Sequence, residues 1–294
     1  MCESNWPHGP RAAAYNRVVA LLKATWLWIL VVGLVLFGAT DLTIRLTGNV
    51  IYYPTVMVIG AFLVPVTFVT FFYRQEDLLE RGVHGSNVLP TLLACALFGG
   101  LIGTLAAGLL EQATMTSTSP ASVAWVGPIE ELAKMIVPVV VFVVARKRFR
   151  SELDGLLFGV AAGMSFAALE TMGYELVALV GSQGNLNVLD ETILIRGLLS
   201  PLGPAAWTGL VAATLWRERE RTGRPFSLAV LGFFLVAAAL HSVWDLASSA
   251  STAVVFGSYA AIGAVSLALL IWRFRQARRT AMVAPHPTLP GSPA

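Results

Sequence analysis

The sequence predicts an all-α protein, a polytopic transmembrane helical bundle of about eight spans with both termini in the cytoplasm. Three observations support this fold class. Hydrophobic residues make up 56% of the 294 residues and charged residues only 13%, with a mean hydropathy of +0.72. A soluble chain would carry about 25% charged residues. Apolar segments long enough to cross a bilayer recur along the chain, and basic residues gather in alternate loops between them.

Eight apolar segments have the length of a membrane-spanning helix. We predict them at residues 17–40, 51–73, 88–110, 121–145, 154–180, 192–216, 226–247 and 253–272. The first is too long for a cleaved signal sequence and is expected to stay as an anchor. We expect a cytoplasmic lead at residues 1–16, a transmembrane domain at 17–279 and a disordered, proline-containing cytoplasmic tail at 280–294.

The loop charges give the orientation. Basic residues fill every second loop, at Arg74 and Arg81, then at Arg146, Lys147, Arg148 and Arg150, then at Arg217, Arg219, Arg221 and Arg224. The intervening loops hold one basic residue, Arg45. The positive-inside rule therefore places both termini in the cytoplasm, as an even number of spans requires. We expect a multi-pass protein of the plasma membrane.

Other features narrow the class of protein. The basic loops lack interleaved aromatic residues, which argues against nucleic-acid binding. Cys2 and Cys95 suggest neither a disulfide framework nor a thiolate metal site. Small residues recur every four positions in the third span, at Gly99 and Gly103, and in the fifth, at Gly155, Gly159 and Gly163. Such stripes favour close helix packing.

Glu130, Glu131 and Lys134 interrupt the otherwise apolar fourth span. A charge at the bilayer centre costs about 3 kcal/mol, so three within five positions need partners. Their spacing puts them on neighbouring helix faces, where Lys134 can neutralise one glutamate and leave the other as a general acid or base. Pro138 cannot donate to the Lys134 carbonyl, which predicts a kink. A charge pair that only holds the bundle together is the alternative.

Three other spans bring ionisable residues to the same depth. Glu170 lies in the fifth span, Arg196 in the sixth, and His241 and Asp245 in the seventh. In the predicted orientation all of them lie in the outer half of the bilayer, which indicates one site open to the extracytoplasmic side. His241 and Asp245, one turn apart, suit a metal ligand oriented by a carboxylate, or a proton relay. A histidine packed in the interior is the alternative.

Established chemistries of intramembrane proteolysis can be compared with these residues. The zinc motif H-E-x-x-H is absent, and His241 is the one histidine predicted inside the membrane. Ser165 follows glycine-rich sequence and is expected to serve packing, and no pair of intramembrane aspartates exists. Activation of water by a carboxylate, with or without a metal, is the chemistry that remains.

Three motifs together resemble the bacterial PrsW family of intramembrane proteases, which is related to the CAAX prenyl endopeptidase and bacteriocin-immunity superfamily. They are Glu130-Glu131-x-x-Lys134, Phe166-x-x-x-Glu170 and His241-x-x-x-Asp245, within about residues 121–247. The resemblance implies that Glu130, Glu131, Lys134 and Asp245 are catalytic, and that Glu130, Glu170 and His241 hold a zinc ion or position water. The implied activity is the first cut of a membrane-spanning anti-sigma factor on its extracytoplasmic side.

One position departs from the family pattern. Relatives often carry a second histidine after the arginine that Arg196 matches and before an aromatic-threonine pair, here Trp207-Thr208. This chain has Pro204 or Ala205 near that place. A catalytic zinc site with three protein ligands and water, a metal-free glutamate mechanism and an inactive relative all stay open.

The function expected from the sequence is an endopeptidase that hydrolyses a peptide bond of a membrane-anchored protein client within the lipid bilayer. A non-catalytic immunity or scaffold protein of the same superfamily is the alternative. A proton-coupled transporter is disfavoured, because no internal repeat of broken helices is present and the ionisable residues are confined to the outer half. The sequence predicts no oligomeric state.

Overall fold

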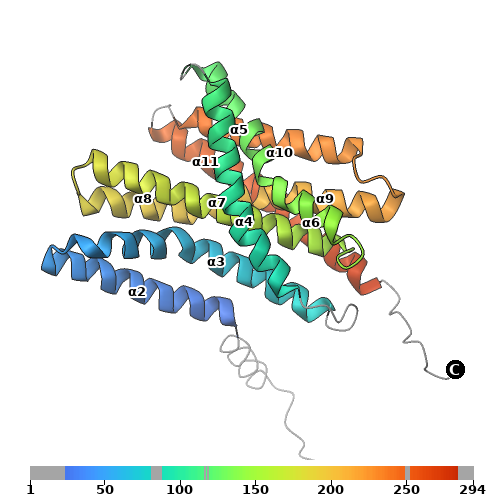
Figure 1. Ribbon diagram of the computed structural model, residues 1–294, viewed down its shortest axis with the longest axis horizontal. Helices are drawn as coiled ribbons and strands as arrows, with labels where there is room; N and C mark the ends of the chain where they lie inside the picture. Colours follow the sequence, from blue (N-terminus) through green and yellow to red (C-terminus); the bar gives the residue numbers. More distant parts are fainter. Residues whose placement is uncertain (1–23, 81–87, 116, 118, 249–251, 284–294) are drawn as a thin grey trace, which may run out of the picture.

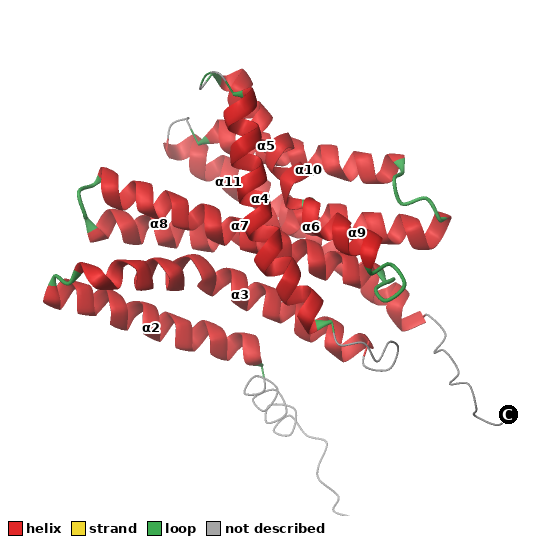
Figure 2. Cartoon of the chain, viewed as in Figure 1, coloured by secondary structure: helices red, strands yellow, loops and turns green. Residues whose placement is uncertain are grey.

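The computed structural model describes residues 24–80, 88–115, 117, 119–248 and 252–283. Within these residues the chain is helical and contains no strand (Figure 2), which confirms the predicted all-α bundle. The elements are α2 (Thr25–Thr47), η1 (Val50–Tyr52), α3 (Tyr53–Glu80), α4 (Leu89–Thr114), α5 (Pro120–Lys134), α6 (Ile136–Val144), α7 (Glu152–Gly181), α8 (Leu186–Leu199), η2 (Ser200–Leu202), α9 (Pro204–Thr222), α10 (Leu228–Ala247) and α11 (Thr252–Val283).

Seven helical stretches in the described part of the chain are long and apolar enough to cross a membrane, with α8 and α9 counted as one. The fourth predicted span, residues 121–145, is instead divided between α5 and α6, which are 15 and 9 residues long. Both halves pack against α4, and together they return along it to the other end of the bundle (Figure 1). The eighth crossing is therefore a broken helix.

The ends of the first and last spans differ from the prediction. The predicted lead at 1–16 and the start of the first span lie outside the described residues, and α2 continues to Thr47 rather than ending at residue 40. At the other end α11 continues to Val283, past the predicted end at 272 and the predicted start of the tail at 280. This extension is held against the bundle because Arg273 is fully buried and contacts Glu152 and Thr214.

Helix α7 lies at the centre of the bundle, and most of its residues are buried. Its glycines let α9 approach closely, since a Cβ on Gly159 would lie 2.6 Å from the Thr208 carbonyl oxygen. On another face a Cβ on Gly99 of α4 would lie 2.7 Å from the Cβ of Ala162. Both predicted small-residue stripes are thus helix contacts, and they place α9 beside the part of α7 from Gly155 to Gly163, about two turns before Glu170.

Two spans are broken near the same place. The break at Met135 comes one turn before Pro138, as expected from the missing donor to Lys134. The sixth predicted span, 192–216, lies within one membrane-crossing stretch, 186–222, but that stretch is not a continuous helix. It breaks at η2, where Pro201 and Pro204 each lack a backbone N–H. As a result, Lys134 ends one helix and Pro204 begins another, and Pro204 lines a cavity between the helices.

The two ends of the bundle differ in charge. In Figure 1 the described chain begins near the lower centre and ends at the lower right, and the loops at 145–151 and 223–227 also lie at the right. The arginine-rich turns that follow α6 and end α9 are therefore together. Helices α2, α7 and α10 end on the opposite, left side, and α4 ends at the top (Figure 1).

Candidate active site

Glu130, Glu131 and Lys134 form a buried ion cluster at the end of α5. Their exposed fractions are 7%, 0% and 0%. The Lys134 ammonium lies 3.0 Å from Glu130 Oε2 and 2.9 Å from Glu131 Oε1, and it sits 4.3 Å from the centre of the Phe166 ring. The lysine therefore bridges both carboxylates, whereas the sequence suggested that it neutralises one and frees the other.

His241 of α10 joins this cluster from across the helix interface. Its Nδ1 lies 2.9 Å from Glu131 Oε1. Its Nε2 lies 3.5 Å from Glu130 Oε2 and 3.5 Å from Asp245 Oδ2. Five of the residues singled out in the sequence thus come together, and each ring nitrogen of the histidine faces a carboxylate.

The two adjacent glutamates occupy different environments. The Glu131 side chain is only 1% exposed. Its Oε1 lies at hydrogen-bond distance from Lys134 Nζ and His241 Nδ1, and its Oε2 accepts a hydrogen bond from the Thr208 hydroxyl at 3.4 Å. The Glu130 side chain is 10% exposed and contacts only Lys134 at hydrogen-bond distance. Glu131 is consequently committed to protein partners, while Glu130 is the more exposed of the two.

The imidazole is held in position from several sides. The Trp207 ring packs 4.7 Å from it, and the Trp207 indole donates to the Ser266 hydroxyl at 2.9 Å. Ser242, the next residue on α10, donates to the Ala124 carbonyl of α5 at 2.7 Å. In the sequence Trp207 and Thr208 served only as a landmark, and Ser266 carried no signal, because such residues are ordinary in membrane helices.

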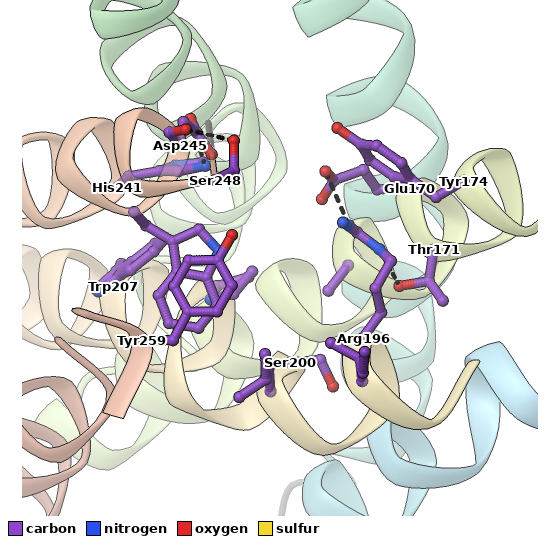
Figure 3. A pocket seen from close by; sticks show the side chains of 15 residues that line it. Glu170, Thr171, Tyr174, Arg196, Ser200, Trp207, His241, Asp245, Ser248 and Tyr259 are labelled. Atoms are coloured by element: carbon purple, nitrogen blue, oxygen red, sulfur yellow. Dashed lines mark hydrogen bonds and ion pairs between the residues drawn. The ribbon is translucent and has the colours of Figure 1, made fainter. Parts of the chain in front are cut away.

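A cavity of about 220 Å³ opens beside the cluster, lined by residues of α7, α8, α9, α10 and α11. His241 and Asp245 lie on one side of it and Glu170 and Arg196 on the other (Figure 3). Tyr259 of α11 lines the cavity and stacks on Trp244 with ring centres 4.0 Å apart. The last span, which carried no family signature, therefore contributes to the site.

Glu170 belongs to the far wall rather than to the histidine cluster. Its Oε1 lies 2.9 Å from Arg196 Nη2. The Arg196 Nε donates to the Thr171 hydroxyl at 3.3 Å, and the guanidinium lies 3.8 Å from the centre of the Tyr174 ring. The structure thus gives Glu170 a cationic partner of its own, from the arginine that the sequence placed at the same depth.

Two further glutamates are buried nearby. Glu111 lies inside α4, just past the predicted end of the third span at residue 110, and its Oε1 is buried without a hydrogen-bond partner. Its charge interacts with those of Glu130 and Asp245. The fully buried Glu175 of α7 also lacks partners on both carboxylate oxygens, but it does not line the cavity. Glu111 is a carboxylate near the site that sequence analysis missed, because it follows the apolar part of its span.

The predicted metal ligands do not form a metal site as they are arranged. His241 Nε2 and carboxylate oxygens are chemically suitable zinc donors. However, Glu130 and Glu170 are each paired with a cationic side chain. Among the residues that the structure describes, no group of three or more histidine, cysteine, aspartate or glutamate side chains is placed to hold a metal ion.

Comparison with known proteins identifies the family. A family model described as PrsW family intramembrane metalloprotease matches residues 88–272, which is more than half of the chain. No curated protein and no solved structure matches the chain. The match extends beyond the predicted 121–247 to include α4 and most of α11, and it contains every predicted site residue. Together with its apolar helices, the match makes this a multi-pass membrane protein. The chain belongs to the PrsW family of intramembrane metalloproteases.

Proposed function

We propose that this protein is an intramembrane endopeptidase of the plasma membrane that cuts a membrane-anchored protein client, such as an anti-sigma factor, near its extracytoplasmic side. The observation that carries the proposal is the setting of His241. One ring nitrogen is held by Glu131 at 2.9 Å, and the other faces Glu130 and Asp245 at 3.5 Å beside the cavity. A group that can accept a proton and a group that can donate a hydrogen bond therefore meet at one point.

In the proposed reaction Glu130 is the general base. A water molecule beside His241 Nε2 donates to Glu130 and attacks the carbonyl carbon of the scissile bond. Glu130 takes the proton as the new carbon–oxygen bond forms, and the carbonyl oxygen becomes an oxyanion. The proton then passes from Glu130 to the amide nitrogen, the carbon–nitrogen bond breaks, and a carboxyl terminus and an amine are released.

His241 acts in this scheme as the donor to the oxyanion. Glu131 fixes the ring orientation through Nδ1, as a carboxylate does in a catalytic triad, so that Nε2 points at the reacting atoms. In this scheme Nδ1 donates to Glu131 and Nε2 donates to the oxyanion, which requires a proton on each ring nitrogen. Lys134 holds both glutamates in place and offsets their charge, and a donor fixed in a dry site stabilises an oxyanion far more than water does.

The loop charges support the proposed side of the membrane. The cavity lies near the end of α10, at Asp245 and Ser248, away from the arginine-rich turns (Figure 1). Because positive loops stay in the cytoplasm, the cavity would open toward the extracytoplasmic side. A client anchored by a single span would meet the site at its outer segment.

The family description implies a metal, and zinc is our proposal for it because histidine and carboxylates are among its ordinary ligands. The side chains as arranged do not present such a site, since Lys134 lies 3.0 Å from Glu130 and Arg196 lies 2.9 Å from Glu170. No step above therefore passes through a metal.

The test compares new protein N-termini in membranes of cells that express wild type, Glu130→Gln or Glu175→Gln. Glu175 is a matched control, because it is buried but lies outside the cavity. We expect fragments of single-span proteins, cut near the outer face, with wild type and Glu175→Gln but not with Glu130→Gln. The same fragments from all three proteins, expressed at equal levels, would refute the protease and favour an immunity or scaffold role.

A further inference from the structure

A client that enters this cavity brings main-chain groups that need partners. Unwinding a helix around the scissile bond frees N–H and C=O groups, and each costs several kcal/mol if it stays unpaired away from water. Many proteins bind an extended peptide by adding it to the edge of a sheet. The described part of this chain has no strand, so side chains have to supply the partners.

Most polar side chains around the cavity already have other tasks. The Ser200 and Ser248 hydroxyls donate to carbonyls of their own helices, at Gly197 and Asp245. The Thr171 hydroxyl accepts a hydrogen bond from Arg196. His241 and Asp245 belong to the proposed reaction centre. Apart from the hydroxyls of two tyrosines and the indole N–H of Trp244, the ion pair of Glu170 with Arg196 is what remains.

The ion pair of Glu170 with Arg196 is fixed in position by neighbouring side chains and lines the cavity. The two side chains are 25% and 27% exposed, in contrast to the near-complete burial of Glu131 and Lys134. The bond to Thr171 and the stacking on Tyr174 fix the plane of the guanidinium. A guanidinium has five N–H donors and a carboxylate has four acceptor positions. Their contact with each other therefore leaves N–H donors on Arg196 and acceptor positions on Glu170 that can bind a further group.

A peptide unit has the complementary groups, one acceptor and one donor. We propose that Arg196 and Glu170 form a main-chain subsite, in which Arg196 donates to a carbonyl of the client and Glu170 accepts from a neighbouring N–H. The inference rests on the proposed function, because it names how the same cavity holds its substrate. The subsite lies across the cavity from His241 (Figure 3), so it holds a peptide unit beside the scissile one. Since the pair is neutral overall, it selects main chain rather than charge.

The competing explanation is a clip that only joins α7 to α8. Removing one partner would leave an uncompensated charge, so the informative variant is Glu170→Met/Arg196→Met, which removes both. The chain offers a matched control in Glu152→Met/Arg273→Met. That pair also joins two helices, with Arg273 Nε 2.8 Å from Glu152 Oε1, but it lies outside the cavity.

The probe is a capped, uncharged peptide of alternating alanine and leucine, together with copies in which one amide at a time is N-methylated. Affinities for the detergent-solubilised full chain are measured by calorimetry. We expect wild type to lose about tenfold affinity when one particular amide is methylated, the size of one hydrogen bond to a charged group. The Glu170→Met/Arg196→Met variant should lose this discrimination, and the control pair variant should keep it.

Three results would overturn the subsite. They are unchanged discrimination in Glu170→Met/Arg196→Met, tighter binding of a peptide with a free carboxyl terminus than of the capped one, and no binding of any peptide to wild type. The readout needs no turnover. If wild type discriminates between the methylated peptides but no client fragments appear in cells, the protease is refuted and the subsite stands. If client fragments appear but wild type does not discriminate between the peptides, the subsite alone is refuted.

Discussion

Gly127→Ala should disable the site although Gly127 takes no part in the chemistry. A Cβ at this position on α5 would lie 2.6 Å from the Ser242 hydroxyl oxygen, and 2.7 Å from both the Ala238 carbonyl oxygen and the Ser242 backbone nitrogen of α10. Two of these three atoms are main chain and cannot rotate away. The helices must therefore separate to admit the methyl group.

The size of the effect follows from these distances. Reaching ordinary contact at 3.4 Å requires α5 and α10 to move apart by about 0.7 Å at the main-chain contacts. The Glu131–His241 bond joins the same two helices one turn away, so it would lengthen from 2.9 Å to about 3.6 Å, which is no longer a hydrogen bond. We expect about 1–3 kcal/mol of destabilisation and about 100-fold lower activity.

The assay is the rate at which client fragments appear in membranes with equal amounts of each variant, beside the thermal midpoint of the purified protein. Gly232→Ala on α10 is the control, because its Cβ would meet nothing within 4 Å. It should keep full activity and gain about 0.5–1 kcal/mol from better helix propensity. Ser242→Ala should not rescue Gly127→Ala, since both main-chain contacts persist. Wild-type activity in Gly127→Ala would refute the coupling of this helix contact to the site.

Four other changes test separate parts of the structure. Glu131→Gln should lower the cleavage rate about 10²- to 10⁴-fold through loss of His241 orientation, with the protein still folded by circular dichroism; an unchanged rate would contradict this role. Arg273→Met should cost about 3–5 kcal/mol in a denaturation experiment, because Glu152 stays buried without its partner, and adding Glu152→Met should restore most of it. Lys134→Met should raise the zinc content of the purified protein, measured by mass spectrometry, because the ammonium no longer competes for Glu130; equal content would contradict that competition. Arg45→Ala removes an ion pair whose arginine is 39% exposed, so the free energy of unfolding obtained from thermal denaturation should fall by no more than about 1 kcal/mol. A larger loss would show that α2 depends on this contact.

The composition of the site could be predicted from the sequence because charges inside a membrane span are costly and must meet. Glu130, Glu131, Lys134, His241 and Asp245 stand out for that reason alone, and the structure brings them together. Which of the two glutamates faces the histidine depends on the packing of α5 against α10. Adjacent positions on one helix differ by about 100°, so the sequence leaves both assignments open.

The parts that were missed depend on contacts between distant segments. The break at η2 interrupts a segment whose hydropathy suits one continuous span, and it alters the shape of the cavity wall. Tyr259 comes from a helix with no signature, and Glu111 sits just past an apolar stretch. The ion pair of Arg196 with Glu170 joins two helices through residues that are 26 positions apart in the sequence. Hydrophobic periodicity cannot reveal such a pairing.

The bond between Glu131 and His241 sets an order of events during synthesis. The two residues are 110 positions apart, so α5 leaves the ribosome well before α10 exists. Lys134 comes from the same helix and can pair with both glutamates at once, but the third contact has to wait. Until α10 is made, Lys134 is therefore the partner within α5 that offsets the charge of the two glutamates.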